Sequence, residues 1–467
     1  MQHKRWLYLL LLIPLTLTWL GVLLELPVWV GYRTSWSAGF WIALYSATSF
    51  ESDALMGYIK FGVAPLMILA TIMYIVGCWA IWRTSKSLNL RTILITLIAN
   101  IVLLLPFIIP NTPASLVSEA VGAAKQTNYI KKHNGDSYNF TYNACRRENN
   151  SLPELYVFAL GESLRYDNLS LNGIYNRHTT PLLERQEALC LYSNYYSTAT
   201  LTQYALPILL TGISPENYKQ HFERKTFISP LHEVGFYTAL VTQHAQLLNT
   251  DLFAYLKNDF DTIIVVAHDS LIAPTINLIA QIEGNVFIMA HYLGNHFFYN
   301  NHPDDYYKWL PDYNLTPNAK NDSLFWNAYD NSVLYTDKIL VDAIKTLEAN
   351  HKQSALLFTS DHGDYLKEYI GGHGMSQKPT KDEYHVPLMV WYSNEYKEAY
   401  PEKVANLIKH KDAPVCADHV FWSVLDMADI RIDSTLQQEG MSVFGDTLLP
   451  HRRTLLLPDG RSVLTLD

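Results

Sequence analysis

The sequence has few charged residues, and these are unevenly distributed along the chain. Charged residues make up 17% of the 467 residues, against about 25% in an average soluble protein. Residues 1–110 contain only seven Lys or Arg and three Asp or Glu, which leaves 28 basic and 41 acidic residues for positions 111–467. Binding to a phosphate backbone needs an excess of Lys and Arg, so we expect no nucleic-acid partner. The hydrophobic share of 49% excludes a chain that is disordered throughout.

Three long apolar stretches without charge lie in the first part of the chain. Each has about the 20 residues that a helix needs to cross a bilayer, and they cover residues 6–24, 63–82 and 92–109. Basic residues precede the first stretch and separate the second from the third: Lys4, Arg5, Arg83, Lys86 and Arg91. By the positive-inside rule both basic segments are cytoplasmic, so three spans deliver residue 111 to the outside. The shorter apolar segment 36–50 is expected to lie in the membrane interface, and its role stays open.

This pattern predicts a transmembrane anchor at 1–110, with about three spans and an interfacial segment. A connector follows at 111–152, and an extracytoplasmic domain at 153–467. Cysteine is scarce: the chain has four, of which Cys145, Cys190 and Cys416 lie beyond the anchor. They allow one disulfide in an oxidising compartment, but their spacing does not determine the pairing. No zinc-finger spacing is present.

Beyond residue 153, short apolar runs alternate with segments of helical periodicity. We expect strands at residues 155–160, 236–241, 262–266, 286–290, 355–359 and 388–392, because short runs of this kind are typical of buried strands. Helices are expected between them, for example at 180–189, 274–283, 326–347 and 420–426. Continuous apolar strands that alternate with helices predict an α/β domain, in which helices cover both faces of a mostly parallel sheet.

Three of the predicted strands lead into side chains that bind metals. The first leads into Glu162, the fourth into His291 and His296, and the fifth into Asp361 and His362. Any one of these alone would more simply be a turn or cap residue. Ligands collect at the carboxyl ends of parallel strands, however, so we expect the whole set at one edge of the sheet. Carboxylate and imidazole ligands without thiolate suit zinc or manganese.

A run of hydroxyl side chains precedes an apolar helical segment near residue 202. Its threonines Thr198, Thr200 and Thr202 are candidate nucleophiles. A hydroxyl at a helix start is normally an N-cap, but the backbone N–H groups there also hold phosphate. A bound metal lowers the pKa of water from 15.7 to about 7. A comparable effect on threonine would make an alkoxide available at neutral pH.

Several motifs together resemble a known family. In chain order they are Gly-Glu-Ser-Leu-Arg at 161–165, Arg-His-Thr-Thr-Pro at 177–181, Asn-Ala-Tyr-Asp-Asn-Ser at 327–332, Ser-Asp-His-Gly-Asp at 360–364 and His-Gly at 373–374. This series resembles the phosphoethanolamine transferases of the alkaline phosphatase/sulfatase superfamily, which include lipopolysaccharide-modifying and mobile colistin-resistance enzymes. The resemblance covers about residues 155–430 and implies an alkaline-phosphatase/sulfatase-like fold for the catalytic domain at 153–467.

Carried over by position, the resemblance implies one Zn²⁺ ion, with Mn²⁺ a less favoured alternative, and four ligands: Glu162, Thr202, Asp361 and His362. Thr202 is the implied nucleophile because it stands five residues before Pro207, as in the family. The resemblance further implies histidines that bind the donor phosphate or a second metal: His296 and His373, with His291 nearby.

The implied activity is transfer of phosphoethanolamine from phosphatidylethanolamine to lipopolysaccharide or another cell-envelope glycan. The enzyme is expected to be a monomer in the inner membrane of a Gram-negative bacterium, with its catalytic domain in the periplasm. The acceptor stays open among lipid A, a core sugar and a glucan. The alternative is another phosphotransferase or hydrolase of the same superfamily, such as a glycerophosphate transferase or phosphodiesterase. An arylsulfatase is not expected, because the Cys/Ser-x-Pro-x-Arg motif that matures to formylglycine is missing.

Overall fold

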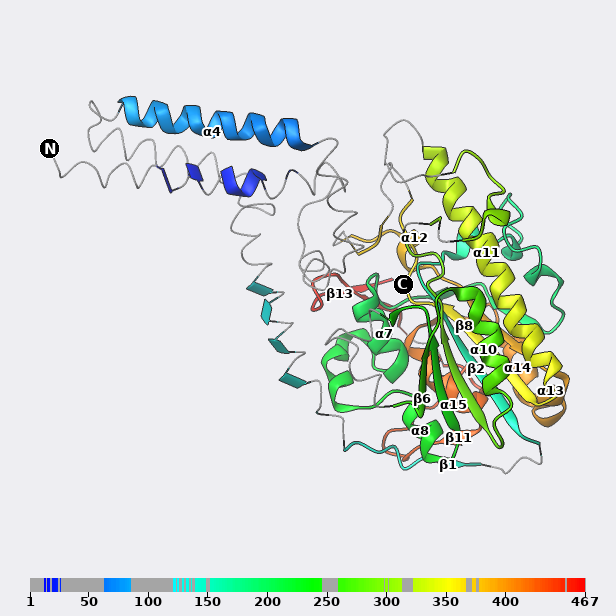
Figure 1. Cartoon of the computed structure of the whole chain (residues 1–467). Helices are drawn as coiled ribbons and strands as arrows, with labels where there is room; N and C mark the ends of the chain where they lie inside the picture. The colour runs from blue at the N-terminus through cyan, green and yellow to red at the C-terminus, as the bar shows by residue number, and fades with distance from the viewer. Residues whose placement is uncertain are drawn as a thin grey trace. The chain divides into compact units, whose positions relative to one another are not determined.

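The structure is a computed structural model of the chain (Figure 1). It describes residues 63–84 and, from residue 139 onward, all except 148–151, 246–258, 298, 301, 313–321, 367–371, 375–377, 450–451 and 467. Of residues 1–62 and 85–138 it describes only isolated positions. The chain divides into two units, Met1–Asn128 and Tyr129–Asp467. The division falls inside the segment predicted as a connector.

The first unit is described mainly through one helix. Helix α4 (Ala64–Thr84) coincides with the second predicted span. Its Tyr74 stacks on Trp19 with 4.7 Å between ring centroids, and Trp19 Nε1 donates a hydrogen bond to Thr71 Oγ1 at 3.3 Å. In the part of the chain that the structure describes, no helix is both long enough and apolar enough to cross a membrane. The third predicted span and the segment 36–50 lie outside the described residues, and the first span is described only at isolated positions.

The second unit is built around a seven-stranded sheet. In spatial order its strands are β3 (Leu189–Tyr192), β9 (Leu388–Tyr392), β8 (Gln353–Ser360), β2 (Glu154–Gly161), β7 (Val286–His291), β5 (Tyr237–Thr242) and β6 (Thr262–Val265). Neighbours from β8 to β6 pair in parallel, whereas β9 runs antiparallel to both β8 and β3. The sheet is mixed and mostly parallel, and it contains all six predicted strands.

Helices and short strand pairs surround this sheet. Among the described residues of the second unit, the α-helices are α7 (Thr202–Thr211), α8 (Ile228–Glu233), α10 (Ile272–Ile279), α11 (Asp322–Ala349), α12 (Lys381–Tyr384), α13 (Asn394–Ala399), α14 (Pro401–His410) and α15 (Asp418–Met427). The short pairs are β1 (Cys145–Arg146) with β11 (Ile430–Arg431), β4 (Tyr195–Tyr196) with β10 (Val415–Cys416), and β12 (Thr454–Leu456) with β13 (Val463–Thr465). The predicted helices 326–347 and 420–426 lie in α11 and α15, and 274–283 overlaps α10.

One predicted helix is wrong. Residues 180–189 form a single 3-10 turn, η5 (Leu183–Arg185), and then enter the edge strand β3. The carboxylate of Asp337, on α11, accepts the backbone N–H groups of Leu182 and Leu183 at 2.9 and 2.8 Å. The segment keeps only local turn bonds, such as Glu184 N–H to Thr180 O at 3.1 Å, and the contact with Asp337 takes the place of a longer helix.

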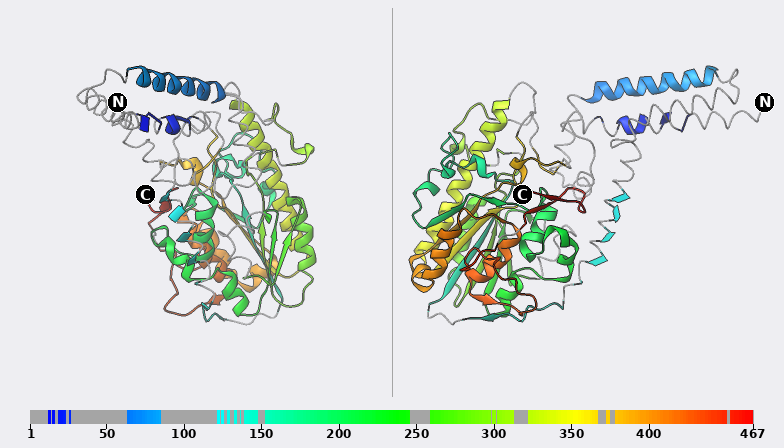
Figure 2. Two further views of the ribbon diagram at one scale, coloured as in Figure 1. Left: turned by 60° about the vertical axis from the view of Figure 1, so that its left-hand side comes forward. Right: turned by 180° about the vertical axis from the view of Figure 1, so that it is seen from behind.

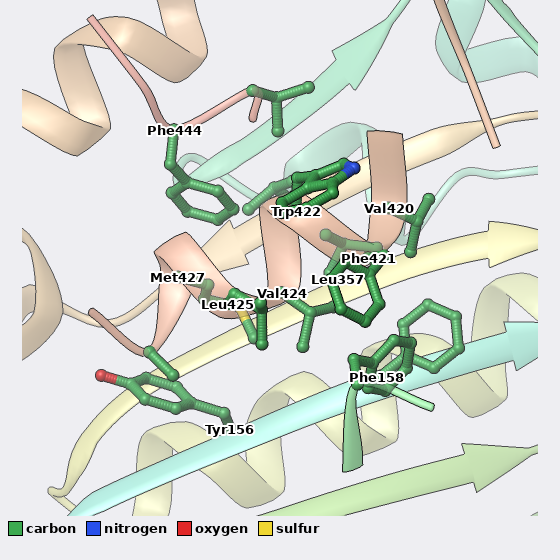
Figure 3. Packing of buried hydrophobic residues seen from close by; sticks show 14 of the residues in the cluster. Tyr156, Phe158, Leu357, Val420, Phe421, Trp422, Val424, Leu425, Met427 and Phe444 are labelled. Carbon is green, nitrogen blue, oxygen red and sulfur yellow. The ribbon is translucent and has the colours of Figure 1, made fainter. Parts of the chain in front are cut away.

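Both faces of the sheet are buried, and the central strand β2 shows how. Tyr156 and Phe158 point to one face and pack against α15, as Figure 3 shows. Leu155 and Val157 point to the other face and join a cluster with residues of α10 and α11. Figure 2 shows α11 and α15 on opposite sides of the sheet. Since alternate side chains of a strand face opposite ways, a strand covered on both sides must be apolar throughout.

The four cysteines are all among the described residues, and none forms a disulfide. Cys145, Cys190 and Cys416 belong to three different strands, β1, β3 and β10. The disulfide that the sequence allowed is therefore absent.

Candidate metal centre

Glu162 directly follows the central strand β2. The side chain is buried, and Ser163 after it takes a left-handed backbone conformation with φ of 57°. Tyr329 of α11 holds this turn, because its hydroxyl donates to Ser163 O at 2.6 Å and accepts the Arg165 N–H at 2.8 Å. The Ser163 hydroxyl donates to Glu162 Oε1 at 3.0 Å. The turn that carries the Glu162 carboxylate is thus held by strand β2 before it and by Tyr329 of helix α11.

Asp361 and His362 follow β8. This strand pairs in parallel with β2, so Asp361 and His362 leave the sheet beside Glu162 and Ser163. Asp361 Oδ1 accepts the N–H groups of Ser163 at 3.2 Å and His362 at 2.8 Å. His362 Nδ1 lies 2.9 Å from Gly363 O, and donating to this carbonyl leaves Nε2 as the basic nitrogen. His362 Nε2 lies 3.2 Å from both Glu162 Oε1 and Asp361 Oδ2.

Thr202 is the first residue of α7, and its hydroxyl lies in this cluster. Oγ1 is 3.2 Å from His362 Nε2 and 3.5 Å from each carboxylate oxygen of Glu162. The hydroxyls of Thr198 and Thr200 are buried and make no hydrogen bond to any residue that the structure describes. Of the three candidate threonines, the structure therefore brings Thr202 into contact with the carboxylate and imidazole groups.

His373 lies next to His362, on the β8 side of Glu162. Its ring centroid is 3.8 Å from that of His362, and its Nδ1 lies 3.7 Å from Asp364 Oδ1. The Tyr299 hydroxyl donates to Asp364 Oδ2 at 2.5 Å. Glu162, His362 and His373 each offer a ligand atom within 4.8 Å of the others. His373 therefore lies beside His362, whose Nε2 contacts the Thr202 hydroxyl.

His291 and His296 lie on the β7 side of Glu162. His291, the last residue of β7, groups with Glu162 and His244, whose ligand atoms all lie within 4.8 Å of one another. His296 places its Nδ1 2.5 Å from Phe297 O, and its ring centroid lies 6.1 Å from that of His244. The predicted histidines thus divide between the two sides of Glu162.

Sequence reasoning missed His244. It comes two residues after the end of β5, the strand beside β7, so the same sheet-edge argument applied to it. The predicted strand ended at Val241, three residues earlier, and a single histidine in the loop that follows carries no pattern of its own. What identifies it is its contact with His291, whose ring it stacks on at 4.5 Å and 15°.

Burial and neighbouring charge set the pKa values of the cluster. Burial alone would raise the pKa of Glu162, but the charge and hydrogen bond of His362 lower it well below its usual range. Burial and the charge of Glu162 raise the pKa of Asp361 to about 7. Burial alone would lower the pKa of His362, whereas Asp361 and Glu162 raise it to about 10. Two carboxylates thus hold a proton on the imidazole between them, and a cation at that place would satisfy the same negative charge.

The donor set suits a zinc ion. Carboxylate oxygens, an imidazole nitrogen and a hydroxyl converge without thiolate, and zinc accepts nitrogen and oxygen ligands in sites that keep one position open. Magnesium and calcium would favour oxygen ligands and water over a buried imidazole. The residues that would hold the ion are Glu162, Thr202, Asp361 and His362. A hydroxyl beside a cation, at the N-terminus of a helix, is an arrangement that can bind and attack a phosphoryl group.

A mostly parallel sheet with a buried carboxylate, imidazole and hydroxyl cluster at its carboxyl edge defines an α/β protein with the machinery for metal-assisted group transfer. The chain belongs to the sulfatase family, which matches residues 154–430.

The chain is also similar to curated proteins. The chain is 26% identical over 301 residues to a Kdo(2)-lipid A phosphoethanolamine 7''-transferase of Escherichia coli K12, and the match covers 60% of this chain and 52% of that protein. The chain spans about half the length of the curated relatives it matches.

Two solved structures share the fold. The C-terminal periplasmic domain of EcEptC from Escherichia coli, in complex with Zn, has a TM-score of 0.61 at 21% identity, over 68% of this chain and 93% of that one. The integral membrane protein lipooligosaccharide phosphoethanolamine transferase A from Neisseria meningitidis has a TM-score of 0.67 at 18% identity, over 93% of this chain and 86% of that one. At these identities the likeness establishes the fold alone.

Proposed function

We propose that this chain is a zinc-dependent phosphoethanolamine transferase that moves phosphoethanolamine from phosphatidylethanolamine to lipopolysaccharide or another envelope glycan. The observation that carries the proposal is the position of the Thr202 hydroxyl, 3.2 Å from His362 Nε2 and 3.5 Å from the Glu162 carboxylate. The names of the curated relatives support the substrate class, and the zinc complex of EcEptC supports the choice of metal.

The reaction proceeds as two displacements on phosphorus. Thr202 Oγ1 gives up its proton to water and attacks the phosphorus, the new Oγ1–P bond forms, and the bond from phosphorus to the glycerol oxygen breaks. Diacylglycerol leaves after its oxygen takes a proton, and we propose His373 or His296 as the donor. An acceptor hydroxyl then attacks the phosphorus and passes its proton to the histidine that protonated the glycerol oxygen. The Oγ1–P bond breaks, and Thr202 Oγ1 takes back a proton from water. Zinc, when bound, would lower the pKa of the threonine hydroxyl and balance charge on the phosphoryl oxygens.

The chemistry can be tested on Thr202 with a neighbouring threonine as control. We expect intact-mass analysis to show a phosphoethanolamine adduct after incubation with phosphatidylethanolamine, and peptide mapping to place it on Thr202. Thr202→Ala should abolish the adduct and the release of diacylglycerol, whereas Thr200→Ala should retain both. An adduct on Thr200, or transfer by Thr202→Ala, would refute the assignment of the nucleophile.

The same assay distinguishes the alternative activities. A glycerophosphate transferase would form its adduct from phosphatidylglycerol, and a phosphodiesterase would release free phosphoethanolamine without an acceptor. For the acceptor, we expect mass spectrometry of envelope glycolipids to show phosphoethanolamine on lipopolysaccharide or another glycan in cells that express the chain. An unchanged glycolipid profile would refute this part of the proposal.

The location we propose is the Gram-negative inner membrane, with residues 1–110 as the anchor and residues 153–467 in the periplasm. The likeness to the Neisseria membrane protein over 93% of this chain supports an anchor of related fold. Tethering would raise the effective concentration of the enzyme at its lipid donor. An alkaline phosphatase reporter fused after residue 120 should be active, and one fused at Ser87 inactive; the reverse pattern would overturn this topology.

A further inference from the structure

The C-terminal hairpin, formed by β12 and β13, contacts the loop that leads to Thr202. This segment, residues 194–201, is called the nucleophile loop below. Leu456 N–H donates a hydrogen bond to Thr198 O at 2.8 Å, and Leu456 also forms a parallel bridge with Ala199. Figure 1 shows the hairpin, in red beside the C-terminus, close to α7, which begins at Thr202. A segment that lies beyond residue 430, where the family match ends, therefore contacts the chain three residues before the candidate nucleophile.

Arg453, directly before β12, holds the other end of the nucleophile loop. Its side chain is buried, and Nη1 donates to Asn194 Oδ1 at 2.6 Å and to Asn194 O at 3.4 Å. The guanidinium also lies over the ring of Tyr196, 4.2 Å from the ring centroid. A guanidinium makes both contacts at once, because it is planar and combines a fixed set of N–H donors with a face that stacks on aromatic rings. One side chain thus joins the hairpin to the first residue of the loop and to β4.

Other elements hold the nucleophile loop further from Thr202. Strand β4 within the loop pairs with β10, and Ser197 N–H donates to Tyr384 O, in α12, at 2.7 Å. The contacts of β12 are with Thr198 and Ala199, which are closer to Thr202 along the chain. The hairpin therefore determines where the last part of the loop lies before α7 begins.

The hairpin has a defined shape and a buried attachment to the domain. Its strands pair in antiparallel register, and Leu466 N–H donates to Arg453 O at 3.0 Å next to the outermost pair. The Asp459 carboxylate accepts two backbone N–H groups of the turn, at 2.9 and 2.8 Å. A two-stranded hairpin is marginally stable by itself in water, and here Leu455 and Leu456 are buried against the rest of the domain. These are the properties that an element needs in order to position another segment.

We infer that the C-terminal hairpin positions the nucleophile of the transfer reaction, and that Arg453 is the positioning residue that acts through the nucleophile loop. A misplacement of about 1 Å can slow a reaction on the order of 100-fold, because the reacting atoms must meet in a narrow range of geometry. Arg453 fixes the start of the loop and β12 fixes its end, so the hairpin limits where Thr202 Oγ1 can lie. The inference rests on the proposed function, in which Thr202 is the nucleophile.

The rate of adduct formation by the full chain tests the inference. In a single turnover with phosphatidylethanolamine, Arg453→Ala should lower the rate constant about 10- to 100-fold. The lipid concentration for half-saturation and the zinc content should stay unchanged, because lipid and metal are bound by other residues. Arg453→Lys should restore part of the rate, since an ammonium can donate to Asn194 but has no planar face for Tyr196. Arg452→Ala is the matched control and should keep the wild-type rate, because Arg452 donates to Thr465 Oγ1, at 2.6 Å, within the hairpin itself.

Two further measurements separate positioning from a general loss of stability. If Arg453 acts through Asn194, the double variant Asn194→Ala/Arg453→Ala should be as slow as Arg453→Ala alone, whereas independent effects would multiply. Hydrogen exchange of residues 194–201, measured without lipid, should be faster in Arg453→Ala than in the wild type and unchanged in Arg452→Ala. Thermal unfolding establishes that each variant is folded. If Arg453→Ala does not fold, Arg453→Lys and Asn194→Ala are measured in its place.

The outcomes distinguish this inference from the proposed function. An adduct that forms at the wild-type rate in folded Arg453→Ala, or exchange of residues 194–201 that does not change in this variant, would overturn the inference. Rates that multiply in the double variant would also overturn it, because Arg453 would then not act through the loop. A wild type that forms no adduct on Thr202 would instead refute the proposed function.

Discussion

The two sides of Glu162 differ in chemistry although the same sheet edge builds both. On the β8 side, His362 Nε2 lies 3.2 Å from Glu162, from Asp361 and from the Thr202 hydroxyl, and this hydroxyl lies 3.5 Å from the Glu162 carboxylate. On the β7 side, His244 and His291 stack on each other and leave buried nitrogens without a described partner. The β8 side holds a hydroxyl among charged groups, whereas on the β7 side burial lowers the pKa of both imidazoles and favours their neutral form. The order of the strands thus determines which side chains lie near Glu162, and the loops after the strands determine which chemical groups those side chains carry.

The largest expected effect comes from the residue that the two sides share. Glu162→Gln removes a negative charge from both clusters, so we expect transfer to fall on the order of 10³-fold, comparable with the loss of a key charge-stabilising group in other enzymes. Zinc content should fall with it. Glu154→Gln is the matched control, because Glu154 is buried at the amino end of the same strand and pairs with Arg146. This control should lose stability and retain zinc; retention of both zinc and transfer by Glu162→Gln would refute the shared role.

The sequence predicts the β8 side better than the β7 side for physical reasons. Glu162, Asp361 and His362 directly follow apolar runs that are long enough to be recognised as buried strands. His244 follows a run whose last residue, Thr242, is polar, and its role depends on a ring contact that only the folded chain contains. Thr202 could not be separated from Thr198 and Thr200 by local pattern, because each is a hydroxyl near the start of one helix.

Prediction of the fold from the sequence has the same limit, because contacts between distant residues leave no local pattern. Strands with both faces covered stand out as continuous apolar runs, so the interior of the sheet was predictable. The edge strand β3 was not, since only Cys190 and Tyr192 are buried while Leu189 and Leu191 are half-buried. The helix predicted there is replaced by contacts to Asp337, a residue more than 140 positions away. Such contacts are specified by tertiary structure and leave no periodic signal in the sequence.

Asp269 gives a pH test that is confined to the β7 side. Burial raises the pKa of this carboxyl to about 6, although the N–H groups of Gly294 and Leu293 lower it. Its pKa in the unfolded chain is about 3.9, so between pH 4 and 6 the folded state holds the proton more tightly. The wild type should therefore gain stability relative to Asp269→Asn as pH falls through 6, by about 2 kcal/mol at pH 4. Denaturant unfolding of both proteins across this range measures it; a difference that does not vary with pH would contradict the raised pKa.

Tyr329 should produce a smaller effect, on the β8 side. Tyr329→Phe leaves Ser163 O and the Arg165 N–H without their partner, and we expect a loss of about 2 kcal/mol in the free energy of unfolding. Zinc affinity should also weaken, since the turn that carries Glu162 is released. Tyr396→Phe is the control: its hydroxyl is also buried and donates to a backbone carbonyl, that of Met427 at 3.1 Å, in the core cluster around α15. It should lose stability with unchanged zinc affinity, and equal zinc affinity in both variants would remove Tyr329 from the site.

The smallest expected effect distinguishes backbone strain from a displacement of Glu162. Gly294 and Gly284 both have positive φ, at 56° and 86°. An added Cβ at Gly294 would lie 3.1 Å from Glu162 N and 3.2 Å from Glu162 O, whereas one at Gly284 would meet nothing within 4 Å. Alanine at either position should therefore cost about 1 kcal/mol of strain. Only Gly294→Ala also pushes on the backbone that carries the shared carboxylate, so its transfer rate should fall while that of Gly284→Ala stays at the wild-type value. Because both positions have a positive φ, the ratio of the two rates measures how closely activity depends on the position of Glu162. Equal rates would show that the loop after β7 does not control that position.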